Sequence, residues 1–200
     1  MLIDLPYTSS IKDMPLMFSE MKRTALLLCE GKCVDEIINL SLEQNIYQLD
    51  TNKRRRDVPL RMVKRLSTLG QPLIHVISDG SDADAKLVAF FALMKADRLL
   101  FEYMQEVYSD KFNSGYNEIS DKDFIDFIDH KAQNNETVAK WSSSNLANIR
   151  GKIKKALCEA GLTKWIYDDL IIQKPIIDNA LLCLFEESDK YYLKAMLIEV

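Results

Sequence analysis

The segment from residue 82 to residue 108 constrains the fold most, because its middle is apolar on nearly every side. Its most apolar window, Leu87–Phe101, spans 15 residues and includes three charged side chains. Crossing a membrane takes about 20 mostly apolar residues, and a helix that is apolar all round has to be buried in a core. The sequence therefore predicts the central helix of a bundle, capped by Ser81 or Asp82 and ending near Tyr108.

Glycine and proline are scarce, at 6 and 5 of 200 residues, which favours long helices over a many-stranded fold. Apolar residues recur every three to four positions in most of the remaining segments. Only residues 165–172 look β-like, and they are compatible with one small hairpin. We expect an all-α protein with further helices over 16–30, 34–43, 58–69, 72–77, 121–131, 136–140, 143–160, 175–185 and 191–198.

Local chemistry indicates where several of these helices begin. Asp57 is a plausible N-cap for a helix starting at Val58, with Pro59 in its first turn. Ser120 and the serines at 142–144 are the corresponding caps further along. We expect the polar loop at 109–120 to separate an N-terminal helical bundle (1–112) from a C-terminal, winged-helix-like helical part (113–200).

Several functional classes are not indicated. The N-terminus has no basic stretch before an apolar run, so we expect a cytoplasmic protein with no membrane partner. His75 and His130 each stand alone, and we expect no metal site and no cofactor. The nucleophile-elbow, phosphate-loop and dinucleotide-binding motifs are missing, so we expect no enzyme activity. The cysteines fit reduced thiols on helix faces: Cys29, Cys33, Cys158 and Cys183.

Charge is distributed unevenly. The whole chain carries a formal −4 and has a pI of about 5.3, which by itself argues against nucleic acid. Residues 53–65, however, hold seven basic side chains against one aspartate, and residues 140–164 hold six against one glutamate. The remainder must then carry −15. Two basic islands on an acidic body are typical of a protein that contacts phosphates locally.

The first basic island contains four consecutive cations, which cannot all face one way on a helix. A solvated loop and helix entry is the alternative to phosphate contact. Its candidate DNA-binding residues are Lys53, Arg54, Arg55, Arg56, Arg61, Lys64 and Arg65.

The second basic island is more ordered. With Leu146 facing inward, a rotation of about 100° per residue places Ser144, Asn148, Gly151 and Lys155 on the opposite face. Small polar groups bordered by long cations suit a helix that enters a DNA groove. An exposed amphipathic helix is the alternative. The candidate DNA-binding residues are Ser143, Ser144, Asn148, Arg150, Lys152, Lys154 and Lys155.

The order of elements around this helix is that of a winged helix-turn-helix: helix, short helix, serine-capped helix, glycine and hairpin. Lys164 and Lys174 are the cations near the hairpin. Asp168 and Asp169 at its tip would repel phosphates and argue against a DNA-contacting wing.

Three segments together resemble the BrxA family of BREX (bacteriophage exclusion) defence systems. The first is MFSEMKRTALLLCEG, residues 17–31. The second joins Glu43–Ile46 to Thr51–Leu69 and contains the pair Arg65-Leu66. The third is KWSSSNLANIRGKIKKALCEAGL, residues 140–162. They occur in the order found in the family, over most of the chain.

The resemblance implies an all-α, NusB-like helical bundle that binds double-stranded DNA with little sequence preference, beside other BREX components. It supports Lys53–Arg65 and Ser143–Lys155 as the contact surfaces. Two other functions stay open: a NusB-like RNA-binding protein, and a protein–protein adaptor whose basic islands meet an acidic partner. Few aromatic residues lie among the cations, so the stacking expected of single-strand binding is not indicated.

Overall fold

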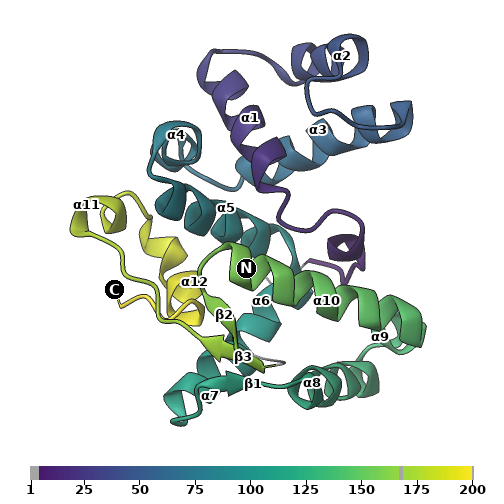
Figure 1. Ribbon diagram of the computed structural model, residues 1–200, viewed down its shortest axis with the longest axis vertical. Helices are drawn as coiled ribbons and strands as arrows, with labels where there is room; N and C mark the ends of the chain where they lie inside the picture. The colour runs from purple at the N-terminus through teal and green to yellow at the C-terminus, as the bar shows by residue number, and fades with distance from the viewer. Residues whose placement is uncertain (1–4, 167–168, 200) are drawn as a thin grey trace. The chain divides into compact units, whose positions relative to one another are not determined.

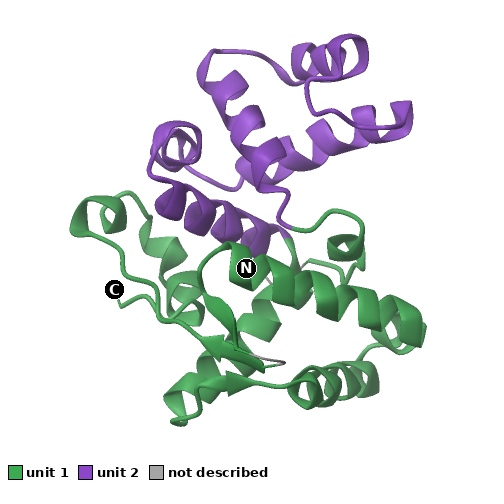
Figure 2. Cartoon of the chain, viewed as in Figure 1, with its two compact units in different colours: residues 1–15, 97–200 green, residues 16–96 purple. Residues whose placement is uncertain are grey.

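The computed structural model describes residues 5–166 and 169–199. It divides into two compact units, shown in different colours in Figure 2. Unit 2 is the continuous segment Leu16–Ala96. Unit 1 combines Met1–Pro15 with Asp97–Val200, so the chain enters unit 2 and then returns to complete unit 1.

Unit 2 consists of helices, labelled in Figure 1. In this unit α1 packs on α3 and α4, α2 packs on α3, and α4 packs on α5. Every residue of α5 from Leu87 to Met94 is buried, as expected for a central helix. The bounds are α1 Phe18–Cys29, α2 Val34–Gln44, α3 Asn52–Leu66, α4 Gln71–Asp79 and α5 Asp82–Ala96.

The prediction of where α3 begins was wrong. The helix starts at Asn52 and not at Val58, because the Thr51 side chain accepts a hydrogen bond from the Arg54 backbone N–H at 3.3 Å. The run of four cations therefore lies inside a helix. Pro59 is an internal residue, at a place where it removes one backbone hydrogen bond.

The central helix is also shorter than predicted. It ends at Ala96, and a new helix, α6 (Arg98–Tyr103), starts after Asp97, whose buried carboxylate accepts from the Leu100 N–H at 3.1 Å. The helical path then continues through the π-helical turn η3 (Met104–Ser109) into α7 (Asp110–Asn113). Much of the loop expected at 109–120 is therefore ordered structure.

Unit 1 contains the remaining helices and a small sheet. The three strands lie in the order β1-β3-β2, all antiparallel, with Trp165 opposite Leu170 and Ile119 also opposite Leu170. The elements are η2 Ser10–Lys12, β1 Glu118–Ile119, α8 Asp121–Asn134, α9 Glu136–Ala139, α10 Ser143–Glu159, β2 Thr163–Ile166, β3 Asp169–Ile172, α11 Asn179–Leu182, η4 Glu187–Asp189 and α12 Lys190–Ala195.

The predicted caps of α8 and α10 are confirmed. The Ser120 side chain accepts from the Asp123 N–H in a capping box, and the Ser142 side chain accepts from the Asn145 N–H at 3.3 Å. Gly161, with φ of 73°, ends α10 in a left-handed conformation. The chain thus passes through α8, turns at α9 and returns along α10 before the hairpin of β2 and β3 (Figure 1).

Two predicted C-terminal helices are shorter in the structure. The segment 175–185 is helical only over α11, and 191–198 ends at Ala195 because Leu197 adopts a left-handed φ of 63°. The fold is mostly helical with a three-stranded antiparallel sheet. The NusB-like comparison stays a prediction. The boundary predicted between residues 112 and 113 falls within unit 1, and whether these parts fold separately also stays a prediction.

Candidate nucleic-acid interface

The outward face of α10 carries the pattern expected from the sequence. Ser144, Asn148, Gly151 and Lys155 are all exposed, spaced four, three and four residues apart. Apart from the backbone of its own helix, a Cβ built on Gly151 would meet no atom within 4 Å. Glycine inside a helix costs about 1 kcal/mol relative to alanine, and packing within the described chain does not require it here. We call these four residues the α10 stripe.

Cations beside the α10 stripe differ in their availability. Lys152 is half-buried and Lys155 is exposed, and neither forms an ion pair with the residues that the structure describes. Ser143, in the first turn, is exposed as well. Two long side chains and the open backbone at Gly151 can therefore approach a ligand without first breaking an ion pair.

Arg150 and Lys154, in contrast, converge on one carboxylate. Arg150 Nη1 lies 3.2 Å from Asp121 Oδ2, and Lys154 Nζ binds the other oxygen of the same group. Lys154 is buried, and its ammonium lies 5.3 Å from the centroid of the Trp165 ring. The hydrogen bond from Lys154 and the charges of both cations lower the pKa of Asp121. These two cations tie α10 to the start of α8 and to β2.

The cations of α3 also fall into two groups. The available group comprises Lys53, Arg54, Arg56 and Lys64, which are exposed, and Arg61, which is half-buried; none forms an ion pair with a described carboxylate. Leu60, 45% exposed, lies among them.

The other group on α3 binds backbone carbonyls. Arg55 Nε donates to the Leu49 carbonyl at 3.0 Å. Arg65 is only 1% exposed, and its Nη1 donates to the Leu16 carbonyl at 3.3 Å. These guanidinium groups stabilise the start of α1 and the turn before α3, so phosphate contact is left to the available group.

The hairpin contributes less charge than its sequence suggested. Lys164 is exposed on β2, whereas Lys174 pairs with Glu199. Of the two aspartates predicted at its tip, Asp168 lies outside the described residues. Asp169 begins β3 and is half-buried.

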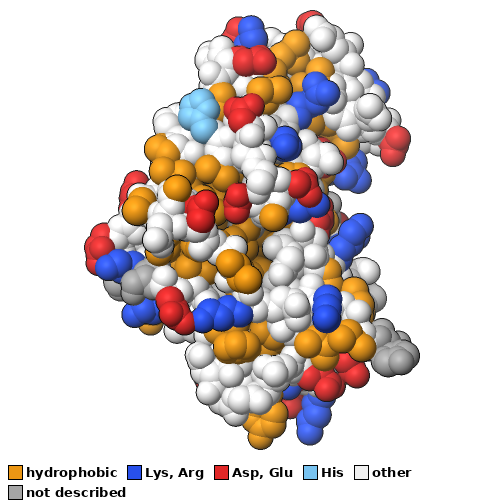
Figure 3. All heavy atoms as spheres, turned by 60° about the vertical axis from the view of Figure 1, so that its left-hand side comes forward, with side chains coloured by type: hydrophobic (Ala, Val, Ile, Leu, Met, Phe, Trp, Pro, Cys, Tyr) orange, Lys and Arg blue, Asp and Glu red, His pale blue; other side chains and the backbone are white. Residues whose placement is uncertain are grey.

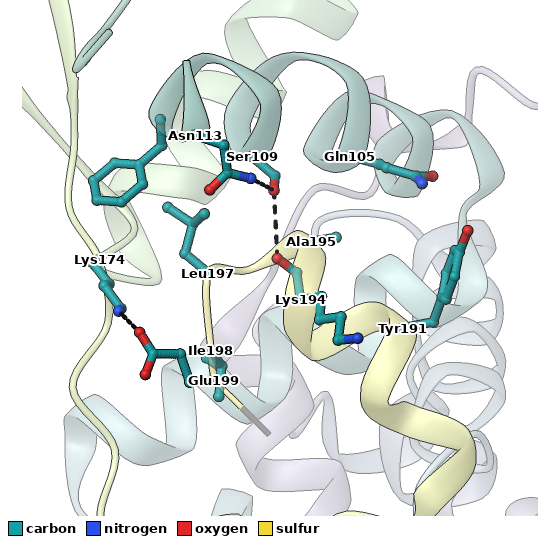
Figure 4. Close-up of a pocket in the computed structure, with 11 residues that line it drawn as sticks. Gln105, Ser109, Asn113, Lys174, Tyr191, Lys194, Ala195, Leu197, Ile198 and Glu199 are labelled. Atoms are coloured by element: carbon teal, nitrogen blue, oxygen red, sulfur yellow. Dashed lines mark hydrogen bonds and ion pairs between the residues drawn. The ribbon is translucent and has the colours of Figure 1, made fainter. Parts of the chain in front are cut away.

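Unit 1 has a hollow of about 550 Å³ (Figure 4). Ser109 Oγ accepts from Asn113 at 3.2 Å and donates to the Lys194 carbonyl at 3.5 Å, so its hydroxyl is held in structural bonds. Lys174 and Glu199 pair at one side of it. No histidine or cysteine is among the described residues that line it.

Within residues 5–166 and 169–199, no three His, Cys, Asp or Glu side chains gather as metal ligands do. Over the same residues, none of the helices combines the length and the apolar character that a membrane span needs.

Charged and hydrophobic side chains are interspersed on the face drawn in Figure 3. The surface there offers no extended field of a single sign.

Comparison with known proteins identifies the family of the chain. The sequence profile of the BrxA family matches residues 5–189. The chain belongs to the BrxA family of BREX phage-defence systems. A BREX protein BrxA from Bacillus cereus is 33% identical over 172 residues, covering 86% of both chains. One from Escherichia coli is 24% identical over 147 residues, covering 74% of this chain and 69% of that protein.

A solved structure shows the same fold. The crystal structure of an uncharacterized protein from Magnetospirillum magneticum superimposes with a TM-score of 0.80, at 22% identity, over 95% of this chain and 97% of that one. At this level of identity the likeness concerns the fold alone.

Sequence reasoning missed the role of Asp121. Its partners lie 29 and 33 residues further along the chain, so no local pattern marks it. The spacing of Arg150 and Lys154, four apart on one helix, was the available signal.

Proposed function

We propose that this BrxA-family chain is a non-enzymatic accessory protein that binds double-stranded DNA in the cytoplasm, beside other BREX components and without a cofactor. The α10 stripe, with Lys152, forms the primary contact. The available cations of α3 form a second contact with phosphates. Because most of these contacts are with the sugar–phosphate backbone of the DNA, the protein has little preference for a particular DNA sequence.

The observation that carries the proposal is Gly151. It lies in the middle of an exposed helix face. No packing contact in the described chain requires a glycine there, and glycine lowers the stability of the helix relative to alanine. A ligand that approaches the backbone of α10 closely would explain why this position lacks a side chain. Ser144 and Asn148 on one side and Lys155 on the other offer hydrogen bonds and charge along the same line.

Arg65 and Lys154 are left out of the proposed contact set because both are buried. Arg55 and Arg150 are left as supports, since their guanidinium groups are engaged with Leu49 and Asp121. This division predicts which basic residues change affinity when they are neutralised.

The test is a fluorescence anisotropy titration of a labelled DNA duplex with the full chain. The variant Lys152→Gln with Lys155→Gln should bind at least tenfold more weakly than wild type, because two phosphate contacts are removed. The matched control is Lys190→Gln with Lys194→Gln, an exposed pair on α12, which should bind as wild type does.

The same titration separates the other functions. Preference for an RNA of equal length over duplex DNA would favour the RNA-binding alternative. Binding to neither at low salt would refute the proposal and leave the adaptor function. Equal loss in both lysine variants would show that only net charge matters.

A further inference from the structure

The exposed face of α3 has an aliphatic residue surrounded by cations. Leu60 is 45% exposed near the middle of the helix. Arg56 precedes it by four residues, Arg61 follows it directly, and Lys64 follows it by four. Side chains four apart on a helix are neighbours, so Arg56 and Lys64 lie on either side of the leucine along the helix. Arg61 lies about 100° round the helix from it, at the edge of the same surface.

The exposed face of α8 repeats this spacing with the opposite charge. Ile125 is 47% exposed. Asp121 precedes it by four residues, Asp126 follows it directly, and Asp129 follows it by four. The pattern R-x3-L-R-x2-K on α3 therefore has its counterpart in D-x3-I-D-x2-D on α8.

The two helices also match in length and availability. They have 15 and 14 residues. In the part of the chain that the structure describes, Arg56, Lys64, Asp126 and Asp129 form no ion pairs. Asp121 is already bound by α10, and Lys122 is a like charge for α3, so the attraction rests mainly on Asp126 and Asp129.

We propose that α3 of one copy of this chain docks on α8 of a second copy. Leu60 packs against Ile125, and the cations of α3 face Asp126 and Asp129. Burying the two aliphatic side chains removes from water two exposed large apolar groups of the described chain. The charges around them set the register and disfavour the pairing of like faces.

A second copy complements the whole of this surface, whereas a phosphate backbone would contact only its cations, so the two contacts proposed for α3 are alternatives. Phosphates would satisfy the cations but leave Leu60 facing a charged strand, and the aspartates beside Ile125 would be repelled by DNA. Only a partner with both an apolar centre and carboxylates around it complements the whole α3 face, and α8 has that arrangement. The α10 stripe takes no part, so the inference does not depend on DNA binding.

The experiment is sedimentation velocity of the full chain over a range of concentrations, at low and at high salt. Wild type should associate reversibly, and more strongly at low salt. Variant A carries Arg56→Glu and Lys64→Glu, and variant B carries Asp126→Lys and Asp129→Lys. Each alone should sediment as a monomer. Mixed, they should associate, because each offers the charges that the other lacks.

Two single substitutions test the apolar centre. Leu60→Ser should weaken self-association about tenfold, as expected for a central anchor. Ile176→Ser is the control at an aliphatic residue that is 97% exposed elsewhere, and should leave association unchanged. Circular dichroism of each variant reports its helix content independently.

A wild-type chain that stays monomeric at low salt, or variants A and B that are folded but do not associate when mixed, would overturn the interface. Duplex binding by the same variants keeps the two proposals apart. If variant A loses DNA affinity but still self-associates, the docking proposal fails while the proposed function stands. If wild type self-associates but binds no duplex, the reverse holds.

Discussion

Replacing Gly151 separates what α10 needs to fold from what it needs to bind. The position is exposed, inside a 17-residue helix, and a Cβ there has open space around it. Gly151→Ala should therefore stabilise the protein by about 0.5–1 kcal/mol, through higher helix propensity and a less flexible unfolded chain. For a chain of this size that corresponds to a rise in Tm of about 1–4 °C.

In the proposed complex, the DNA duplex occupies the open space beside Gly151. Gly151→Gln adds a side chain that the helix tolerates but that a closely approaching backbone does not. We expect unfolding stability no lower than that of wild type and duplex affinity reduced about tenfold, or about 1.4 kcal/mol. Gly151→Ala should fall between the two in affinity.

Thermal unfolding followed by circular dichroism, and anisotropy with a labelled duplex, measure the two effects on the same preparations. Ser143→Gln, at an exposed position in the first turn of α10, serves as a milder comparison. Unchanged duplex affinity in Gly151→Gln would refute the assignment of the α10 stripe. A loss of stability in Gly151→Ala would contradict the helix geometry on which the assignment rests.

Three further predictions concern buried and paired groups. Arg65→Met should lower the free energy of unfolding by about 2–3 kcal/mol, because it leaves the Leu16 carbonyl without its donor; chemical denaturation measures this, and a neutral result would contradict the structural role. The pKa of Asp121 is lowered in the folded state, so its stabilising contribution is present above the ordinary value of 3.8 and is lost as the pH falls through the folded value; the acid limb of stability against pH should be shallower in Asp121→Asn, and identical curves would exclude the ion pairs. Burial and the Glu102 carboxylate raise the pKa of Tyr7 to about 12; ultraviolet titration should show one tyrosine ionising at lower pH in Glu102→Gln, and no change would refute the contact.

Features that depend on local chemistry could be predicted from the sequence. The burial of α5 follows from an apolar pattern with no polar face, and the starts of α8 and α10 follow from Ser120 and Ser142. The exposure of the α10 stripe follows from helical periodicity alone. In these cases neighbouring residues carry the determining interaction.

Features that depend on a single polar group, or on a partner distant in the chain, could not be predicted. The start of α3 was misplaced because its first turns hold charged residues with no apolar period, and a threonine hydroxyl sets the boundary. In the sequence Asp97 resembles any polar residue inside a helix. The structure shows that its carboxylate caps α6, which ends the preceding helix. Arg65 reads as a surface cation, although it is buried against Leu16, 49 positions earlier in the chain.

The salt dependence of duplex affinity tests the central claim most directly. Each phosphate contact lowers the slope of log K against log salt by about 0.9. The account predicts a steep negative slope for wild type and a slope less steep by about 1.8 for Lys152→Gln with Lys155→Gln. A wild-type slope near zero, or the same slope in wild type and variant, would contradict phosphate binding by α10.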